Sequence, residues 1–158
     1  MSARVLVAGV GNIFLGDDAF GCEVARRMGM RPMPEDVTVT DFGIRGFDLA
    51  CALTDGYETA VLVDACERGG EPGTLYVIEP QVAVSGALEP HALQPEKVLA
   101  FARNFGPLPK KTFVVGCEPH HTGADGDGHM GLSRPVAESV DKAVEIVESL
   151  IKEKDEQK

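Results

Sequence analysis

Short runs of β-branched residues alternate with longer segments of helical periodicity along the whole chain. This alternation constrains the fold more than any other feature, because parallel strands need long crossover connections that are usually helical. Helices on such connections cover both faces of the sheet. We therefore expect one three-layer α/β domain, with a mostly parallel five-stranded sheet and helices on both faces.

The expected strands are residues 4–9, 37–41, 60–63, 74–79 and 112–117. The expected helices are residues 18–30, 47–54, 96–104 and a last one marked by an apolar stripe: Val136, Val140, Ala143, Val144, Val147 and Ile151. Two long loops, 80–95 and 118–132, separate these elements. The domain is expected to span residues 1–151, and the charged segment 152–158 is expected to fray as a tail.

The 25 acidic and 15 basic side chains give a net charge of −10. Such a chain repels phosphate backbones, which argues against nucleic acids and anionic membranes as partners. The sequence has neither the pattern of a signal peptide nor an apolar run of about 18 residues. We expect a cytoplasmic monomer.

The four cysteines are scattered along the chain without a C-x-x-C pair: Cys22, Cys51, Cys66 and Cys117. This spacing favours neither a disulfide framework nor a structural zinc site. We interpret all four as small apolar residues near the core.

The segment between Gly9 and Gly21 follows a strand and opens a helix. It departs from the dinucleotide fingerprint, because Phe14 occupies the third glycine position and Asp17 and Asp18 would oppose a pyrophosphate. A nucleotide-dependent enzyme is therefore the less favoured alternative. A helix start favours one capping carboxylate, so we expect one of Asp17 and Asp18 to cap the helix. The other then faces the groove beyond the strand ends, where it can bind a cation.

Asp64 ends the apolar strand 60–63, and open α/β sheets place their sites at this edge. The simpler interpretation is an aspartate in a turn. His91, in the loop 80–95, would complete an oxygen and nitrogen metal site with Asp64 and the groove-facing aspartate of the pair. A lone loop histidine, however, is more often only exposed to solvent.

The segment 120–129 carries three histidines and two aspartates, and therefore offers a rival site. Its Asp-Gly repeats do not match an EF-hand, since no glutamate closes a twelve-residue loop. We favour a solvated loop, because ordering a glycine-rich segment costs entropy. The alternative function is a nickel-binding delivery or chaperone module that uses His120–His129.

Several motifs together resemble the hydrogenase maturation endopeptidase family over residues 3–150. They are Gly9-x-Gly11-Asn12-x-x-x-x-Asp17-Asp18-x-x-Gly21, Val63-Asp64-Ala65, Gly73-Thr74-Leu75-Tyr76, Gly116-Cys117-Glu118-Pro119 and Gly131-Leu132-Ser133. The resemblance implies removal of the C-terminal extension of a nickel-iron hydrogenase large-subunit precursor after nickel insertion. The nickel is carried by the precursor, and zinc or another divalent ion is a possible surrogate.

The resemblance also assigns the residues that contact the metal and support cleavage: Asp18, Asp64 and His91. We then expect Asp17 to cap the helix, and the alternative is that it serves as a nearby base. Many family members have glutamate where this chain has Asp18, so the carboxylate reaches less far here.

The segment 41–46 departs from the family pattern at Phe42 and Arg45. We expect Phe42 and Arg45 to help select the substrate. The simpler interpretation is that Arg45 forms a local ion pair with Asp18 and Asp64, which orders the loop.

Overall fold

The computed structural model describes residues 4–82, 94–120 and 131–156. Its single sheet has the strand order β2-β1-β3-β5-β4, in which only the β4–β5 pair is antiparallel. The strands are β1 Val5–Val10, β2 Val37–Gly43, β3 Thr59–Ala65, β4 Leu75–Ile78 and β5 Lys111–Cys117. The mostly parallel five-stranded sheet predicted from the alternation is confirmed.

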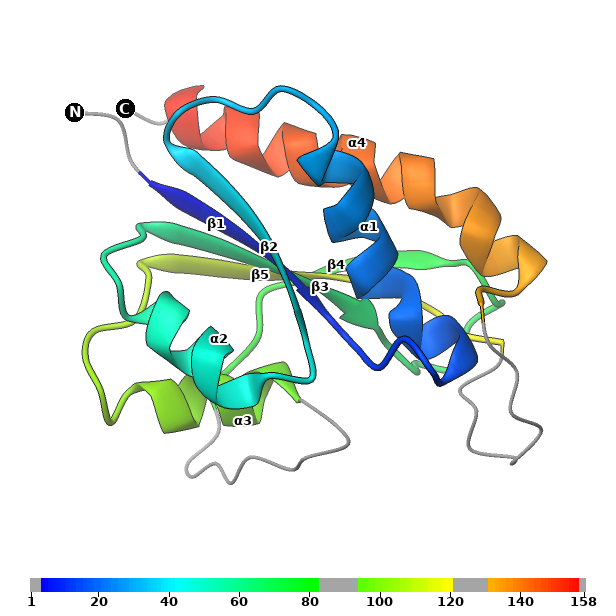
Figure 1. Ribbon diagram of the computed structural model, residues 1–158, viewed down its shortest axis with the longest axis horizontal. Coiled ribbons are helices and arrows are strands. Elements are labelled where there is room, and N and C mark those ends of the chain that lie inside the picture. Colours follow the sequence, from blue (N-terminus) through cyan, green and yellow to red (C-terminus); the bar gives the residue numbers. More distant parts are fainter. Residues whose placement is uncertain (1–3, 83–93, 121–130, 157–158) are drawn as a thin grey trace.

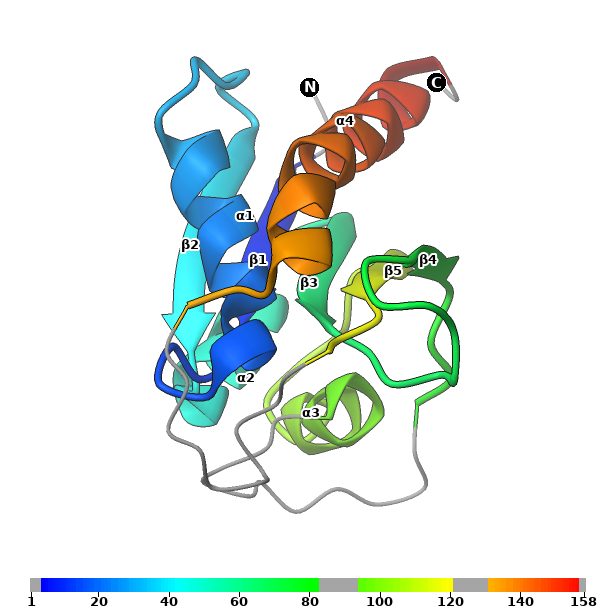
Figure 2. The same cartoon turned by 90° about the vertical axis from the view of Figure 1, so that its right-hand side faces the viewer.

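Two layers of helices enclose the sheet (Figures 1 and 2). The helical elements are η1 Gly16–Ala19, α1 Phe20–Gly29, α2 Gly46–Leu53, α3 Pro95–Ala102 and α4 Arg134–Glu156. Helices α1 and α4 cover one face, and α2 and α3 cover the other. None of the helices within the described residues is long and apolar enough to cross a membrane.

The core is divided in two by the sheet, and β1 shows why. Alternate side chains of a strand point to opposite faces, so Val5 and Val7 pack with α1 and α4, whereas Leu6 and Ala8 pack with α2 and α3. All six residues of β1 are buried. Strands buried on both faces must be apolar throughout, which explains the continuous hydrophobic runs in the sequence.

The last helix is longer than the sequence predicted. Its apolar stripe from Val136 to Ile151 is buried as expected. The helix continues to Glu156, so residues 152–156 of the expected tail are helical, and 157–158 lie outside the described residues.

The first predicted helix consists of two elements, because the 3-10 turn η1 precedes α1. The interpretation of the cysteines is correct for Cys22 and Cys117, which are buried, but wrong for Cys51, which is exposed. Cys66 is half-buried. Cys51 lies in α2, on the side of that helix turned away from Leu49 and Leu53, which are both fully buried.

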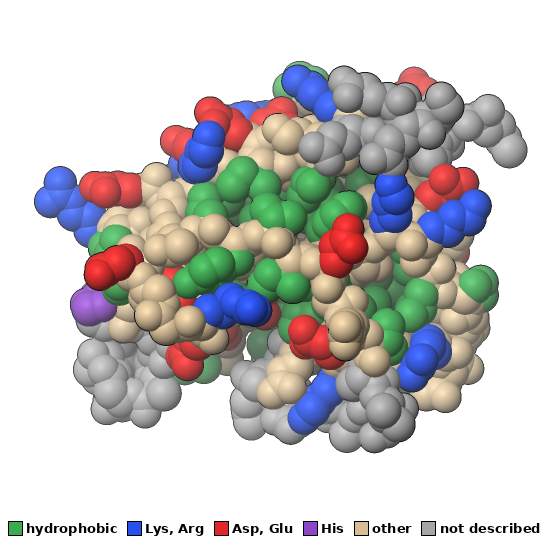
Figure 3. Space-filling view, turned by 180° about the vertical axis from the view of Figure 1, so that it is seen from behind, with side chains coloured by type: hydrophobic (Ala, Val, Ile, Leu, Met, Phe, Trp, Pro, Cys, Tyr) green, Lys and Arg blue, Asp and Glu red, His purple; other side chains and the backbone are tan. Residues whose placement is uncertain are grey.

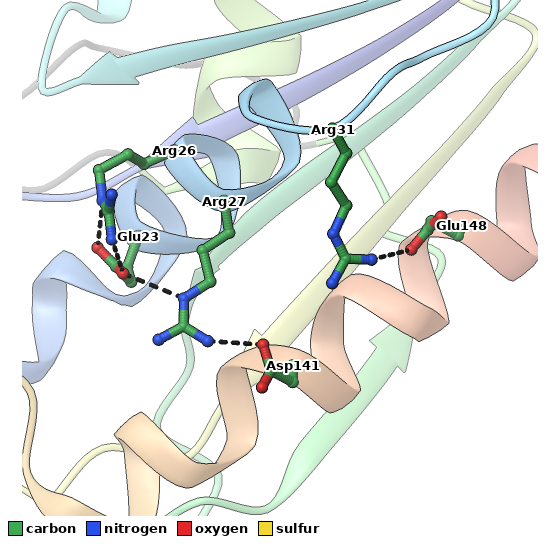
Figure 4. A network of polar contacts seen from close by, with 6 residues as sticks. All are labelled: Glu23, Arg26, Arg27, Arg31, Asp141 and Glu148. Carbon is green, nitrogen blue, oxygen red and sulfur yellow. Dashed lines mark hydrogen bonds and ion pairs between the residues drawn. The ribbon is translucent and has the colours of Figure 1, made fainter.

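Ion pairs join α4 to α1 and to the turn after α1 (Figure 4). Arg27 contacts Asp141 at 2.6 Å, and Arg31 contacts Glu148 at 2.9 Å. These pairs are exposed, and such pairs contribute about 0.2–1 kcal/mol each. The buried stripes of the two helices, rather than these charges, hold the layer together.

Charges of both signs are spread over the face that carries β4. Seen from behind Figure 1, Lys and Arg side chains lie among Asp and Glu side chains around its rim (Figure 3). The net charge of −10 therefore does not create a single acidic surface on this side.

Candidate functional site: an acidic pair at the carboxyl edge of the sheet

Glycines in the loop after β1 and at the start of α1 allow backbone contacts that are too close for any other residue. A Cβ atom on Gly21 would overlap the carbonyl oxygen of Val63. Gly11 has a φ of +145°, and a Cβ there would overlap the carbonyl oxygen of Asp18. The glycine spacing of the first motif therefore brings η1 directly against the end of β3.

This approach places Asp18 near Asp64. One oxygen of Asp18, Oδ2, accepts a hydrogen bond from the backbone N–H of Asn12 at 2.8 Å. One oxygen of Asp64, Oδ1, accepts a hydrogen bond from the backbone N–H of Ala65, also at 2.8 Å. Among the described residues, nothing donates to the second oxygen of either carboxylate. Each aspartate is thus oriented by the backbone and keeps one oxygen available.

Burial and mutual repulsion make this pair costly to ionise. Burial is the main cause that raises the pKa of Asp64 well above its ordinary value, and the nearby Asp18 carboxylate raises it further. Burial also raises the pKa of Asp18, although the Asn12 hydrogen bond lowers it in part. Two close carboxylates without a basic partner favour a proton or a metal cation between them.

The structure brings together two of the three predicted site residues. His91 lies outside the described residues, so its place relative to Asp18 and Asp64 stays a prediction. Within residues 4–82, 94–120 and 131–156, no three His, Cys, Asp or Glu side chains are grouped closely enough to hold a metal ion by themselves.

Asp17 does not have the capping role that the sequence suggested. Neither η1 nor α1 has a side-chain cap hydrogen bond. Asp17 is instead fully buried. It accepts hydrogen bonds from the backbone N–H of His120 and from both the backbone N–H and the hydroxyl of Ser133, at 2.7–2.8 Å. Asp17 thus ties η1 to the segments after β5 and before α4.

Sequence reasoning did not include Asp41 among the candidate site residues. It lies at the end of β2 and pairs in register with Gly9 of β1. Burial raises the pKa of the Cys22 thiol, and Asp41, Asp18 and Asp64 raise it further. All three aspartates are therefore close enough to this thiol to act on it electrostatically. The sequence could have indicated Asp41, because it lies near the carboxyl end of a strand, and the carboxyl ends of parallel strands meet at one edge of the sheet.

Arg45 orders its own loop, but not through the groove carboxylates. Its guanidinium donates to the carbonyl oxygens of Asp41 at 2.7 Å and Phe42 at 3.2 Å. Its ion pair is with Asp48 at 3.3 Å. Asp48 takes the place of the expected partners Asp18 and Asp64. Both Arg45 and Asp48 are exposed, so this ion pair forms without burying the guanidinium.

Glu118, which directly follows β5, orders the backbone that follows β3. Oε1 of Glu118 accepts hydrogen bonds from the backbone N–H groups of Arg68 and Gly70 and from the Tyr76 hydroxyl, at 2.7–3.0 Å. The Arg68 hydrogen bond is the main cause that lowers the pKa of Glu118. This glutamate fixes the connection that leaves β3 just after Asp64.

The fold and the site together define an α/β protein with two neighbouring carboxylates, Asp18 and Asp64, at the carboxyl edge of its sheet. A family model described as hydrogenase maturation protease matches residues 22–150. The chain therefore belongs to the hydrogenase maturation protease family, and it is a peptidase of that family.

Individual relatives agree with this assignment over nearly the whole chain. The hydrogenase 2 maturation protease of Escherichia coli is 29% identical over 154 residues, which is 95% of this chain and 92% of the relative. The solved structure of the maturating endopeptidase HybD from E. coli has a TM-score of 0.77, 29% identity, and coverage of 95% of this chain and 93% of its own. The NiFe hydrogenase maturation protease HycI from Thermococcus kodakarensis has a TM-score of 0.71, 25% identity, and coverage of 95% and 93%.

Proposed function

We propose that this protein removes the C-terminal extension of a nickel-iron hydrogenase large-subunit precursor after nickel insertion, and that it recognises the nickel carried by the precursor. The observation that supports this most is the acidic pair, in which Asp18 and Asp64 each keep one oxygen without a hydrogen-bond donor among the described residues. Membership of the maturation protease family supports the substrate class.

In this proposal the two aspartates contact the nickel of the precursor and hold the bond to be cleaved beside it. Nickel supplies Lewis-acid chemistry, which polarises a carbonyl group or lowers the pKa of a bound water. The Asn12 and Ala65 backbone N–H groups fix the two carboxylates before the precursor arrives. His91 is the proposed third contact.

The raised pKa values of Asp18 and Asp64 add a requirement. A carboxyl group must lose its proton before it binds a metal, so nickel and protons compete for this pair. Nickel recognition should therefore weaken as the pH falls toward the pKa values of the pair. In the protein without the precursor, a proton bound to Asp64 removes its repulsion with Asp18.

The deciding experiment incubates the protein with the large-subunit precursor, with and without nickel, and measures intact masses. Asp18→Ala, Asp64→Ala and His91→Ala should each fold and fail to shorten the nickel-loaded precursor. Loss of an outer partner of a metal typically costs about 10- to 100-fold, so loss of a direct contact should cost at least about 100-fold. Asp55→Ala is the control, since Asp55 is exposed and precedes β3 at the opposite edge of the sheet. Normal processing by one of the three variants would remove that residue from the mechanism.

The same assay tests the rival module at 120–129, most of which lies outside the described residues. Simultaneous replacement of His120, His121 and His129 should leave shortening of the precursor unchanged. A protein that binds nickel through this segment but never shortens the precursor would instead be a delivery module.

A further inference from the structure

A small cavity lies beside the acidic pair, between the loop after β1 and the turn after β2. Its volume is about 290 Å³, and its walls include the side chains of Ile13, Phe14 and Ile44. Pockets for whole drug-sized ligands and cofactors start at about 300 Å³. This cavity is at that lower limit, so its size suits one or two amino-acid side chains better than a nucleotide.

Three large apolar side chains at this cavity are exposed to water. The exposed fractions are 50% for Ile13, 62% for Phe14 and 41% for Ile44. Exposed apolar side chains that gather at one concavity, rather than singly, are typical of a binding site. Here they stand on two loops that flank one cavity.

The two loops are held in position by their own hydrogen bonds. The backbone N–H of Gly11 donates to the carbonyl oxygen of Gly43 at 3.0 Å and joins one loop to the other. The backbone N–H of Phe14 donates to Oδ1 of Asn12 at 2.9 Å. Arg45 braces the second loop through the carbonyl oxygens of Asp41 and Phe42. The apolar walls are therefore formed before any partner arrives, which lowers the entropic cost of binding.

The cavity adjoins Asp18 through Asn12. Asn12 lines the cavity, and its backbone N–H holds the Asp18 carboxylate at 2.8 Å. Asp41 also lines the cavity and adds a third carboxylate at this edge of the sheet. A partner seated in the cavity therefore combines an apolar side chain with a neighbouring positive charge. A polypeptide that carries a nickel ion next to an apolar residue has this chemistry.

We propose that this cavity is a specificity subsite, which binds one apolar side chain of the precursor close to the bond that is cleaved. The inference rests on the proposed function. It adds Ile13, Phe14 and Ile44 as residues that select the substrate sequence without taking part in the chemistry.

The first test measures processing kinetics on the nickel-loaded precursor for Phe14→Ala and Ile44→Ala. One apolar contact in a pocket discriminates by about 10- to 200-fold. The KM for the precursor should rise about tenfold or more, whereas kcat should stay within about twofold. Met30→Ala is the matched control, because Met30 is 68% exposed and follows α1 outside the cavity. Unchanged KM values for both cavity variants would overturn the proposal.

The second test introduces opposite charges into the precursor and the cavity, and it identifies which precursor residue binds there. Residues on both sides of the cleaved bond are replaced by aspartate one at a time, and each precursor is offered to the wild-type protein and to Phe14→Arg. For one position, Phe14→Arg should process the aspartate precursor faster than the wild type does, because the new guanidinium pairs with it. If no position shows this reversal, the cavity does not bind the segment around the bond.

The two levels of the proposal fail in different ways. If the proposed function is wrong, the wild-type protein does not shorten the nickel-loaded precursor at all. If only the subsite is wrong, the wild type shortens it, and the Phe14 and Ile44 variants do so with the same KM.

Discussion

Two adjacent aspartates have opposite roles in this protein. Asp17 is fully buried and binds the flanks of a distant segment through His120 and Ser133. Asp18 lies near Asp64, and one of its carboxylate oxygens accepts no hydrogen bond from the described residues. The 3-10 turn η1 separates their directions, since successive side chains in it lie about 120° apart. One residue supports the scaffold and the other carries the candidate chemistry.

The buried acid Asp64 predicts an unusual dependence of stability on pH. Burial first, and the Asp18 carboxylate second, raise its pKa in the folded state. Between the unfolded and folded pKa values, the folded protein therefore retains a proton that the unfolded chain has lost. The stability that this group contributes is complete below its unfolded pKa of about 3.9, and it is lost as the pH rises through the folded value.

Asp64→Asn should therefore be more stable than the wild type above the folded pKa, with a difference that shrinks as the pH falls. The amide keeps an oxygen for the Ala65 N–H and removes the buried charge. A gain of about 1 kcal/mol is typical of such changes, and it corresponds to about 2–4 °C in Tm at this chain length. Thermal unfolding from pH 4 to pH 8 measures it, with Asp55→Asn as the exposed control. A constant difference across that range would contradict the prediction.

At the scale of elements, close backbone approach places the site. Helix α1 begins directly against β1 and β3, which is possible because Gly21 has no side chain. The opposite end of the same helix is open, and a Cβ atom on Gly29 would meet nothing within 4 Å. Gly21 is therefore required by close packing, whereas the space around Gly29 would accept a larger side chain.

This contrast predicts opposite effects of the same substitution in α1. Gly21→Ala forces the helix away from the carbonyl oxygens of Val63 and Val10, and it should destabilise the protein by about 3 kcal/mol or more. Gly29→Ala only removes backbone freedom from the unfolded chain, and it should stabilise by about 0.5–1 kcal/mol. Urea unfolding followed by circular dichroism measures both. Equal effects of the two substitutions would show that the approach to β3 is not tight.

The elements were largely predictable from sequence, because apolar period and strand alternation are local signals. The stripe from Val136 to Ile151 and the position of Asp64 at a strand end followed from such patterns. The inward direction of Asp17 did not, since its donors are more than a hundred residues away in the sequence. The pairing of Arg45 with Asp48 was also missed, because spacing alone does not rank competing carboxylates.

At the scale of the whole molecule, the sheet couples two half-cores. Strands β1 and β3 have side chains in both half-cores. Detachment of either helix layer would therefore expose apolar side chains of these two strands to water. Unfolding should therefore be a single cooperative transition, as is usual for domains of about this size. The four free cysteines report on different parts of this structure.

Thiol labelling in increasing urea tests this cooperativity. Cys51 is exposed and should react in the native protein, whereas Cys22 and Cys117 are buried. Burial raises the pKa of Cys117 to about 11, and it also raises that of Cys22, so few reactive thiolates exist in the folded state. Cys22 in α1 and Cys117 in β5 should become labelled at one urea concentration, the midpoint of the loss of circular dichroism. Peptide mapping by mass spectrometry separates the sites, and earlier labelling of Cys22 would mean that α1 leaves the sheet before the rest unfolds.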